Sequence, residues 1–464
     1  MDGQTGSKTV SVMHKLHDPV DDHPGIGTKI IATIGPASRS RQTLAALVAA
    51  GADGFRINCS HTPREAIEEI VRDVRSVGNS FIMADLAGLK LRTRDRLTAK
   101  KGGVLTISYA ALNHRISEVK IGAEVVFGDG TNRGKVLWVS DTQCGVEAEE
   151  ELDLPAGGAV HLSGAQISGS CMEDHDRADM EAAIAAGCDW IALSYVRDGA
   201  DAASAVAAIG GRAGVIAKIE RVSAIEDLAG ICNHVDAIMI ARGDLGVDMP
   251  YARVPAAQRS IYRYCRSRGI PVVCATEMMQ SMITSTRPTR AEVGDVEAVM
   301  RYGYDAILLT AETAIGKHPE LVVQTAAEIR SVAEPNIARE VGDDYETDVE
   351  VAKAAVALAD RTGAAAIVAL TSTGRTAKIV AGARPASPVY AVSDSPEIAR
   401  RVGLYHGIIP FVAPRHGGVE ESGAGILRAL VAAGKIPYGA VCILVGSRVG
   451  PDQDADVVMI RVAD

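Results

Sequence analysis

The stretch Gly214–Val247, GVIAKIERVSAIEDLAGICNHVDAIMIARGDLGV, alternates between two kinds of pattern. Short buried apolar runs at Val215–Ala217 and Ala237–Ile240 read as strands, and Ser223–Cys232 between them reads as a helix. A strand, a helix and a second strand in this order form a βαβ unit, in which the two strands run parallel. The stretch therefore predicts one unit of an α/β fold.

Three charged residues lie where the two strands of this unit end. Lys218 and Glu220 are two residues apart, so in an extended chain they share one face. Asp244 follows the second strand, and neighbouring parallel strands lie about 4.8 Å apart. Glu220 and Asp244 are therefore expected to meet over one Mg²⁺ or Mn²⁺ ion, with the Lys218 charge beside it. The alternative is a Lys–Glu surface pair followed by a turn-forming Gly-Asp.

The same alternation extends in both directions from this unit. Eight strand patterns, most of them followed by helical stretches, point to a TIM (β/α)₈ barrel. An open doubly wound sheet is the alternative on periodicity alone. The expected strands span 29–34, 54–58, 81–85, 190–194, 215–217, 237–240, 271–276 and 306–310.

Polar side chains gather just past the strand ends, where a barrel carries its chemistry. Each residue alone has an alternative role as a helix cap or loop residue, above all Ser60 and Thr276. Besides the βαβ unit, the residues concerned are Arg56, Asn58, Ser60, His61, Asp85, Thr276 and Glu312.

The pattern also predicts how the chain divides. Residues 1–27 are expected to form a flexible tail, and residues 28–92 and 163–344 the catalytic barrel. Residues 93–162 alternate as short strands (104–108, 119–121, 124–127, 135–139, 143–148) with turn signals such as Gly128-Asp129-Gly130, which predicts an inserted all-β lid. Such a lid excludes water from the chemistry when it closes. Residues 345–464 show a second βα pattern and predict a C-terminal α/β regulatory domain.

A loop in this last domain passes from a strand into a helix at Leu370–Ala377. Exposed amides, the helix dipole and an arginine at such a helix start are suited to a phosphate group of an effector. An ordinary Ser/Thr cap is the alternative. The residues are Thr371, Ser372, Thr373, Gly374, Arg375 and Thr376.

Composition excludes several classes of function. A net charge of −10 argues against nucleic acid or an anionic membrane as the main partner. The eight cysteines are scattered without a C-x-x-C pair, which favours reduced thiols and a cytoplasmic chain. The sequence lacks a long apolar run, a signal-peptide core, and the Walker and Rossmann fingerprints.

Several stretches of the chain resemble the pyruvate kinase family. The matches run in order through the barrel and continue more weakly into the C-terminal domain, whereas the inserted lid matches poorly. They are TKIIATIGPAS (28–38), FRINCSH (55–61), DWIALSYVR (189–197), IAKIE (216–220), ARGDLGV (241–247), PVVCATEMMQSMITSTRPTRAEVGDV (271–296), TAETAIGKHP (310–319) and TSTGRTA (371–377).

This resemblance implies phosphoryl transfer from phosphoenolpyruvate to ADP, giving pyruvate and ATP. By position, Glu220 and Asp244 would hold the divalent cation, and Lys218 would stabilise charge on the phosphoryl group and the enolate. Thr276 would lie on the proton path to the enolate carbon. Further implied roles are substrate carboxylate binding by the amides at Arg242, Gly243 and Asp244, phosphate binding by Arg56 and Arg92, and contacts with the nucleotide side by Asn58, His61 and the lid residue Asp129.

One departure from the family concerns the monovalent cation. In relatives that need K⁺, Asn58, Ser60 and Asp85 would share it with the carbonyl of a following Thr, and a Glu lies five residues past the Asp. This chain has Leu86 and Lys90 at those two positions. A lysine ammonium supplies the positive charge of K⁺, so activity without K⁺ is predicted. The alternative is Lys90 as a solvated loop residue.

Other departures concern nucleotide recognition. The lid is short for the family, Ala87 replaces a common lysine, His161 stands where Asn is usual, and Glu277 where Gln is frequent. The resemblance as a whole favours a cytoplasmic, homotetrameric pyruvate kinase with a phosphorylated effector. Two alternatives to this function remain. One is a paralogue or metal-dependent lyase or aldolase acting on another enol phosphate or a pyruvate enolate without ADP. The other is a catalytically silent binding protein, against which the intact charged cluster counts.

Overall fold

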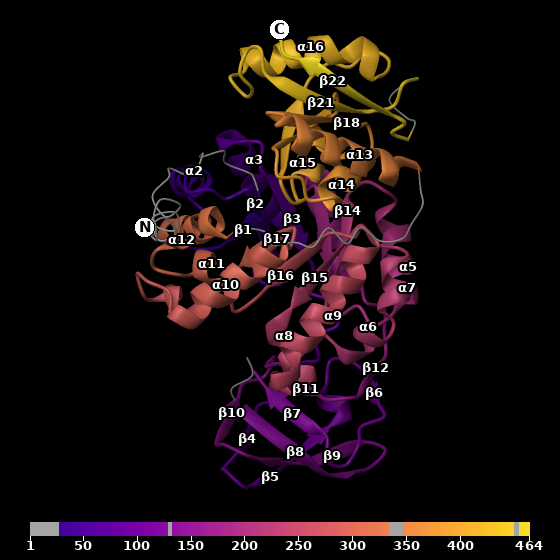
Figure 1. Ribbon diagram of the computed structural model, residues 1–464. Helices are drawn as coiled ribbons and strands as arrows, with labels where there is room; N and C mark the ends of the chain where they lie inside the picture. The colour runs from indigo at the N-terminus through magenta and orange to yellow at the C-terminus, as the bar shows by residue number, and fades with distance from the viewer. Residues whose placement is uncertain (1–26, 129–131, 334–346, 450–453) are drawn as a thin grey trace, which may run out of the picture.

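The computed structural model describes residues 27–128, 132–333, 347–449 and 454–464. The predicted tail, except for its last residue, and the lid residue Asp129 lie outside these ranges. Figure 1 shows three parts in a row, with a barrel between a small β-domain and the C-terminal domain.

Eight parallel strands close into a barrel, which confirms the predicted (β/α)₈ fold. They are joined in the order β1-β17-β16-β15-β14-β13-β3-β2. Their bounds lie within two residues of the predicted ones: β1 (Lys29–Ile34), β2 (Gly54–Asn58), β3 (Phe81–Asp85), β13 (Trp190–Leu193), β14 (Gly214–Ile219), β15 (Ala237–Ala241), β16 (Val272–Ala275) and β17 (Ala306–Leu309).

Large and small side chains fill the barrel interior together. Trp190 and Phe81 are fully buried, and each faces a glycine on a neighbouring strand. A Cβ atom at Gly214 would lie 2.5 Å from the Trp190 ring, and one at Gly54 would lie 2.3 Å from the Phe81 ring. The two rings can lie over these positions only because neither carries a side chain. The barrel is therefore a packed core, and chemistry is confined to its ends.

Helices surround the barrel. One predicted helix, 223–232, is in fact two, because the backbone at Asp227 leaves the helical region and its carboxylate accepts the Gly199 N–H at 2.7 Å. The helices are α2 (Arg41–Ala49), α3 (Ile67–Val77), α4 (Asp174–Ala186), α5 (Gly199–Ile209), α6 (Val222–Glu226), α7 (Leu228–Cys232), α8 (Arg242–Asp248), α9 (Val254–Ser267), α10 (Arg290–Tyr302), α11 (Ala311–Ala314) and α12 (Pro319–Val332).

The inserted segment is an all-β domain, as predicted. Five of its strands form one sheet in the order β11-β7-β8-β9-β5. The predicted strand 119–121 is wrong, because Glu118 and Gly122 on either side of it have positive φ angles of 60° and 84° and interrupt the extended chain. The strands are β4 (Leu97–Ala99), β5 (Val104–Ser108), β6 (Ile116–Ser117), β7 (Glu124–Phe127), β8 (Asn132–Val139), β9 (Gln143–Ala148), β10 (Leu152–Leu154), β11 (Val160–Leu162) and β12 (Gln166–Ile167).

The C-terminal domain is a five-stranded sheet with helices on its faces, in the strand order β20-β19-β18-β21-β22. It packs on the barrel end opposite the lid, where the Lys29 ammonium donates to the Ile408 carbonyl at 2.7 Å. Its elements are α13 (Thr347–Thr362), β18 (Ala366–Leu370), α14 (Arg375–Gly382), β19 (Val389–Ser393), α15 (Pro396–Val402), β20 (Ile408–Val412), α16 (Val419–Ala432), β21 (Val441–Gly446) and β22 (Val457–Val462).

Two predictions from composition concerned the cysteines and membrane-spanning helices. All eight cysteines are buried, and each is a free thiol. In the part of the chain that the structure describes, no helix has both the length and the apolar character needed to cross a bilayer.

Candidate active site

Asp85 is the centre of a buried charge network at the carboxyl end of the barrel strands. Its Oδ2 accepts from Arg56 at 2.6 and 2.7 Å, and its Oδ1 accepts from the Lys218 ammonium at 3.1 Å. Burial alone would raise the pKa of Asp85, but Arg56 and Lys218 outweigh it and lower the pKa. Asp85 is therefore a permanent anion that holds two cations in fixed positions.

Lys218 lies between two carboxylates. Its Nζ is 2.9 Å from Glu220 Oε1 and 2.8 Å from the Ser194 hydroxyl, in addition to its contact with Asp85. Burial would lower the pKa of Lys218, but Asp85 and Glu220 together raise it above the usual value. The ammonium therefore keeps its proton and acts as a fixed positive charge rather than as a base.

Tyr195 joins the two carboxylates predicted to bind metal. Its backbone N–H donates to Glu220 Oε2 at 2.6 Å, and its hydroxyl donates to Asp244 Oδ1 at 3.1 Å. Burial raises the pKa of Glu220, Lys218 opposes this, and Asp244 raises it further, which reflects two carboxylates sharing one site. Both side chains therefore lie at the same end of the barrel.

The donor set fits a hard divalent cation. Among the described residues no cluster of three or more His, Cys, Asp or Glu side chains is suited to metal. With only two carboxylates available, Glu220 and Asp244 would supply two of the ligands, and water and substrate oxygens would supply the others. Mg²⁺ sites in phosphoryl-transfer enzymes commonly have this composition, because Mg²⁺ keeps part of its hydration shell.

The start of helix α8 contacts the loop that follows strand β16. The Gly243 N–H donates to the Thr276 hydroxyl at 2.8 Å, and Arg242 donates to the Thr276 carbonyl at 2.8 and 3.1 Å. Thr276, Glu277 and Tyr195 all have positive φ angles, of 67°, 54° and 56°. Non-glycine residues in this region are strained and cluster at functional sites.

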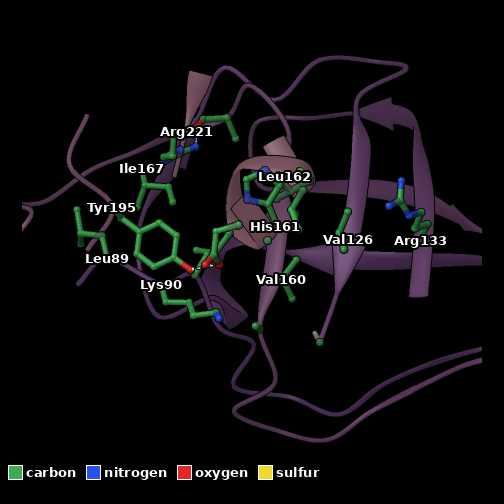
Figure 2. A pocket seen from close by; sticks show the side chains of 18 of the residues that line it. Leu89, Lys90, Val126, Arg133, Val160, His161, Leu162, Ile167, Tyr195 and Arg221 are labelled. Carbon is green, nitrogen blue, oxygen red and sulfur yellow. Dashed lines mark hydrogen bonds between the residues drawn. The ribbon is translucent and has the colours of Figure 1, made fainter. Parts of the chain in front are cut away.

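A cleft of about 300 Å³ lies between this cluster and the lid. Tyr195, Asp244 and Lys90 line it from the barrel side, and His161 lines it from lid strand β11. Figure 2 shows Lys90 and Tyr195 on one side of the cleft and Val160 and His161 on the other. The cleft is therefore bounded by both domains, as a lid over an active site requires.

A hydrogen bond joins the lid to helix α8 across the cleft. His161 Nε2 lies 2.9 Å from Asp248 Oδ1, and Asp248 Oδ2 accepts the Val222 N–H at the start of α6. Burial would raise the pKa of Asp248, but the contact with His161 outweighs it and the pKa is lowered.

Several predicted residues are not part of this cluster. Asn58 Oδ1 accepts the Ser60 N–H at 3.2 Å, and Ser60 and His61 are exposed. Arg92 is exposed and donates to the lid carbonyl of Gly157 at 2.9 Å. None of these four residues lines the cleft. A nucleotide role for Asn58, His61 and Arg92 therefore requires a ligand that reaches beyond the cleft.

The predicted effector loop lies in the C-terminal domain, at the opposite end of the molecule from the lid (Figure 1). Gly374, with a φ of 94°, donates its N–H to Thr371 Oγ1 at 2.9 Å. The Arg375 guanidinium is 2.6 Å from Asp348 and 3.2 Å from Asp454. A phosphate at this loop would have to displace two carboxylates.

Sequence reasoning gave no role to Ser194, Tyr195, Arg221 and Arg415. Ser194 and Tyr195 follow strand β13, so the rule used for the other strand ends would have found them. Arg221 lines the cleft and donates to the Ala165 carbonyl at 3.0 Å. Arg415 donates to Ser372 in the effector loop at 3.1 Å, a contact between distant segments that no local signal shows.

A (β/α)₈ barrel whose mouth gathers paired carboxylates and buried cations under an inserted lid has the organisation of an enzyme active site. The family model of the pyruvate kinase barrel domain matches in two segments, residues 26–111 and 87–323, and the model of the pyruvate kinase alpha/beta domain matches residues 349–461. The chain belongs to the pyruvate kinase family.

Individual relatives agree with this assignment. A pyruvate kinase of Agrobacterium vitis is 36% identical over 410 residues, covering 82% of this chain and 85% of that protein. Pyruvate kinase 2 of a Synechocystis species is 35% identical over 417 residues, covering 83% of this chain and 70% of that protein. A crystal structure of a pyruvate kinase from Cryptosporidium parvum superposes with a TM-score of 0.89 at 27% identity, covering 96% of this chain and 98% of that one.

Proposed function

We propose that this enzyme transfers the phosphoryl group of phosphoenolpyruvate to ADP, giving pyruvate and ATP, with Mg²⁺ or Mn²⁺ held by Glu220 and Asp244. The observation that carries the proposal is the joining of these two carboxylates and Lys218 at the barrel mouth, where Tyr195 contacts both acids. A divalent cation bound there would neutralise charge on the phosphoryl and enolate oxygens.

The basic residues supply positive charge beside the reacting atoms. Lys218 stays protonated, so it would stabilise negative charge on the transferring phosphoryl group and on the enolate oxygen. Arg56 is held by Asp85 and would bind the phosphate. Because both cations are fixed before substrate arrives, little reorganisation is needed during the reaction.

The α8 amides and Thr276 would bind and protonate the substrate. Backbone N–H groups at Arg242, Gly243 and Asp244 open helix α8 and would receive the substrate carboxylate, consistent with the anion preference of helix starts. The Gly243 amide is bonded to the Thr276 hydroxyl, so substrate binding would release that hydroxyl. A freed Thr276 hydroxyl would then be available on the proton path to the enolate carbon.

The proposal is tested by pyruvate release from phosphoenolpyruvate, with ADP and Mg²⁺ each present or absent. Pyruvate formation that needs both supports the proposed reaction. Divalent-dependent turnover without any need for ADP would favour a lyase or aldolase that uses a pyruvate enolate.

We also propose that the reaction does not need K⁺. Both Asp85 oxygens are bonded to the chain's own cations, and Lys90, which makes no ion pair among the described residues, lines the cleft. Replacing K⁺ by Na⁺ or Tris in the assay is expected to change kcat less than twofold, since positive charge is already in place.

The matched variant is Lys90→Glu, which reverses the charge. In the absence of K⁺ it is expected to lose about tenfold or more in kcat/KM, and added K⁺ should restore part of the loss. A wild-type enzyme that is inactive without K⁺ would refute the proposal.

The bond between His161 and Asp248 is proposed to hold the lid over the cleft. Because such a hydrogen bond contributes about 1 kcal/mol, His161→Ala is expected to raise KM for ADP about fivefold with a smaller change in kcat. The control is His114→Ala, a lid histidine paired with Glu173 at 3.3 Å rather than with α8. Equal KM values for the two variants would contradict the role of His161.

The remaining proposals concern nucleotide, effector and assembly. Asn58, His61 and Arg92 would contact nucleotide phosphates that extend past the cleft. A phosphorylated effector would bind at Thr371–Thr376, where Arg415 adds a cation beside Ser372. The family resemblance further favours a homotetramer, which light scattering of the purified enzyme would measure.

A further inference from the structure

A second cavity lies between the barrel and the C-terminal domain, on the side away from the cleft. Helix α9 contributes Tyr262 and Arg266, helix α14 contributes Lys378, and Arg384 and Tyr405 complete the C-terminal side. This interdomain cavity holds about 290 Å³ including its opening to solvent, of which about 10 Å³ is open to the centre of a water molecule, room for one water or one phosphoryl oxygen.

The lining is strongly basic. Three cations, Arg266, Lys378 and Arg384, face one carboxylate, Asp305. Asp305 is already fully engaged, because it lies 3.0 Å from Arg384 and accepts the N–H groups of Val272 and His406 at 2.9 and 3.1 Å. Arg384 is fixed further by donating to the Gly303 carbonyl. Asp305 and Arg384 therefore neutralise each other, and the charges of Arg266 and Lys378 remain.

Among the residues that the structure describes, Arg266 and Lys378 make no ion pair. Nη2 of Arg266 is buried and has no hydrogen-bond acceptor, and Lys378 makes no ion pair in the described part of the chain. Burial and the nearby Arg384 lower the pKa of Arg266 to about 10. Burial also lowers the pKa of Lys378, although Asp236 and Asp305 oppose it. Positive charges held together without a counter-charge are costly, and a bound anion removes that cost.

We propose that this interdomain cavity binds a phosphoryl group, as inorganic phosphate or as a phosphate monoester, through Arg266 and Lys378. One phosphoryl oxygen would lie beside the buried Arg266 Nη2, and the rest of the group would lie toward solvent. Tyr262 and Tyr405 line the wall there and would contact the carbon part of a monoester. The ligand would join barrel helix α9 to helix α14, which begins at the effector loop.

Thermal unfolding of the full chain tests this site. The midpoint is measured in inorganic phosphate, in glycerol phosphate and in chloride at equal ionic strength, with EDTA present so that no divalent cation recruits phosphate to the barrel mouth. Phosphate is expected to raise the wild-type midpoint by several degrees, because a ligand that binds only the folded state stabilises it. Arg266→Gln and Lys378→Gln are each expected to lose most of that shift.

Two control variants separate this site from others. Arg263 lies on the exposed side of helix α9, and Arg375 lies in the predicted effector loop. The variants Arg263→Gln and Arg375→Gln should therefore keep the rise in unfolding midpoint that phosphate causes. Lys378→Arg should keep it as well, since the charge remains. A larger shift with glycerol phosphate identifies a monoester as the ligand, and equal shifts identify free phosphate. A full shift in both glutamine variants at Arg266 and Lys378, or its loss in Arg375→Gln, would overturn the proposal.

Discussion

Lys218→Met is expected to lower kcat for pyruvate formation about 10³-fold, with a much smaller change in KM for phosphoenolpyruvate. The ammonium is the one cation that contacts both Asp85 and Glu220 in the described site, and its raised pKa keeps it charged throughout the assay range. Removing it takes away charge that matters most when the phosphoryl group is in transfer. Steady-state kinetics with saturating Mg²⁺ and ADP measures the effect.

Stability has to be measured alongside, because methionine leaves two buried carboxylates without their shared partner. Lys218→Arg is the matched variant, since it keeps the charge but changes the donor geometry, and it should retain more activity than Lys218→Met. A folded Lys218→Met enzyme with kcat within tenfold of wild type would show that the ammonium does not stabilise the reacting atoms.

Glu220→Gln and Asp244→Asn are each expected to weaken Mn²⁺ binding by at least about 100-fold and to abolish turnover at ordinary Mg²⁺ concentrations. Each substitution replaces an anionic oxygen ligand by a neutral amide of nearly the same shape. Binding is measured directly by titration with Mn²⁺, so the result does not depend on activity.

Glu277→Gln provides the control for this pair. Glu277 lines the same cleft, but its carboxylate accepts from the Tyr251 hydroxyl at 2.8 Å and it is not a proposed ligand. It should therefore bind Mn²⁺ like the wild type. Equal losses in all three variants would mean that the overall negative charge of the cleft, rather than two specific carboxylates, attracts the ion.

Most of the barrel was predictable because its signals are local. Each strand is a short apolar run, and polar residues past the strand ends are expected to converge at one face. The errors lie where tertiary contacts override local pattern. Helix 223–232 is broken because Asp227 bonds to Gly199 on another helix, and the expected lid strand 119–121 is interrupted by a positive φ angle at Glu118.

In the candidate site, too, the spacing of neighbours in sequence could be predicted, whereas contacts between distant strands could not. The spacing of Lys218 and Glu220 indicated a shared face, whereas the pairing of Asp85 with both Arg56 and Lys218 joins three different strands and leaves no local trace. The strand-end rule would have placed Tyr195 at the barrel mouth, but it could not have shown which groups Tyr195 contacts. Its backbone angle, which places its N–H on Glu220 and its hydroxyl on Asp244, is set by the folded loop and not by its neighbours in sequence.

Anomalous diffraction from a crystal soaked in Mn²⁺ would show whether Glu220 and Asp244 together hold one divalent cation. We expect one strong peak at the barrel mouth, within about 2.0–2.3 Å of a carboxylate oxygen from each residue. A peak bound to only one of the two side chains, or a peak elsewhere with this pair metal-free, would contradict this expectation.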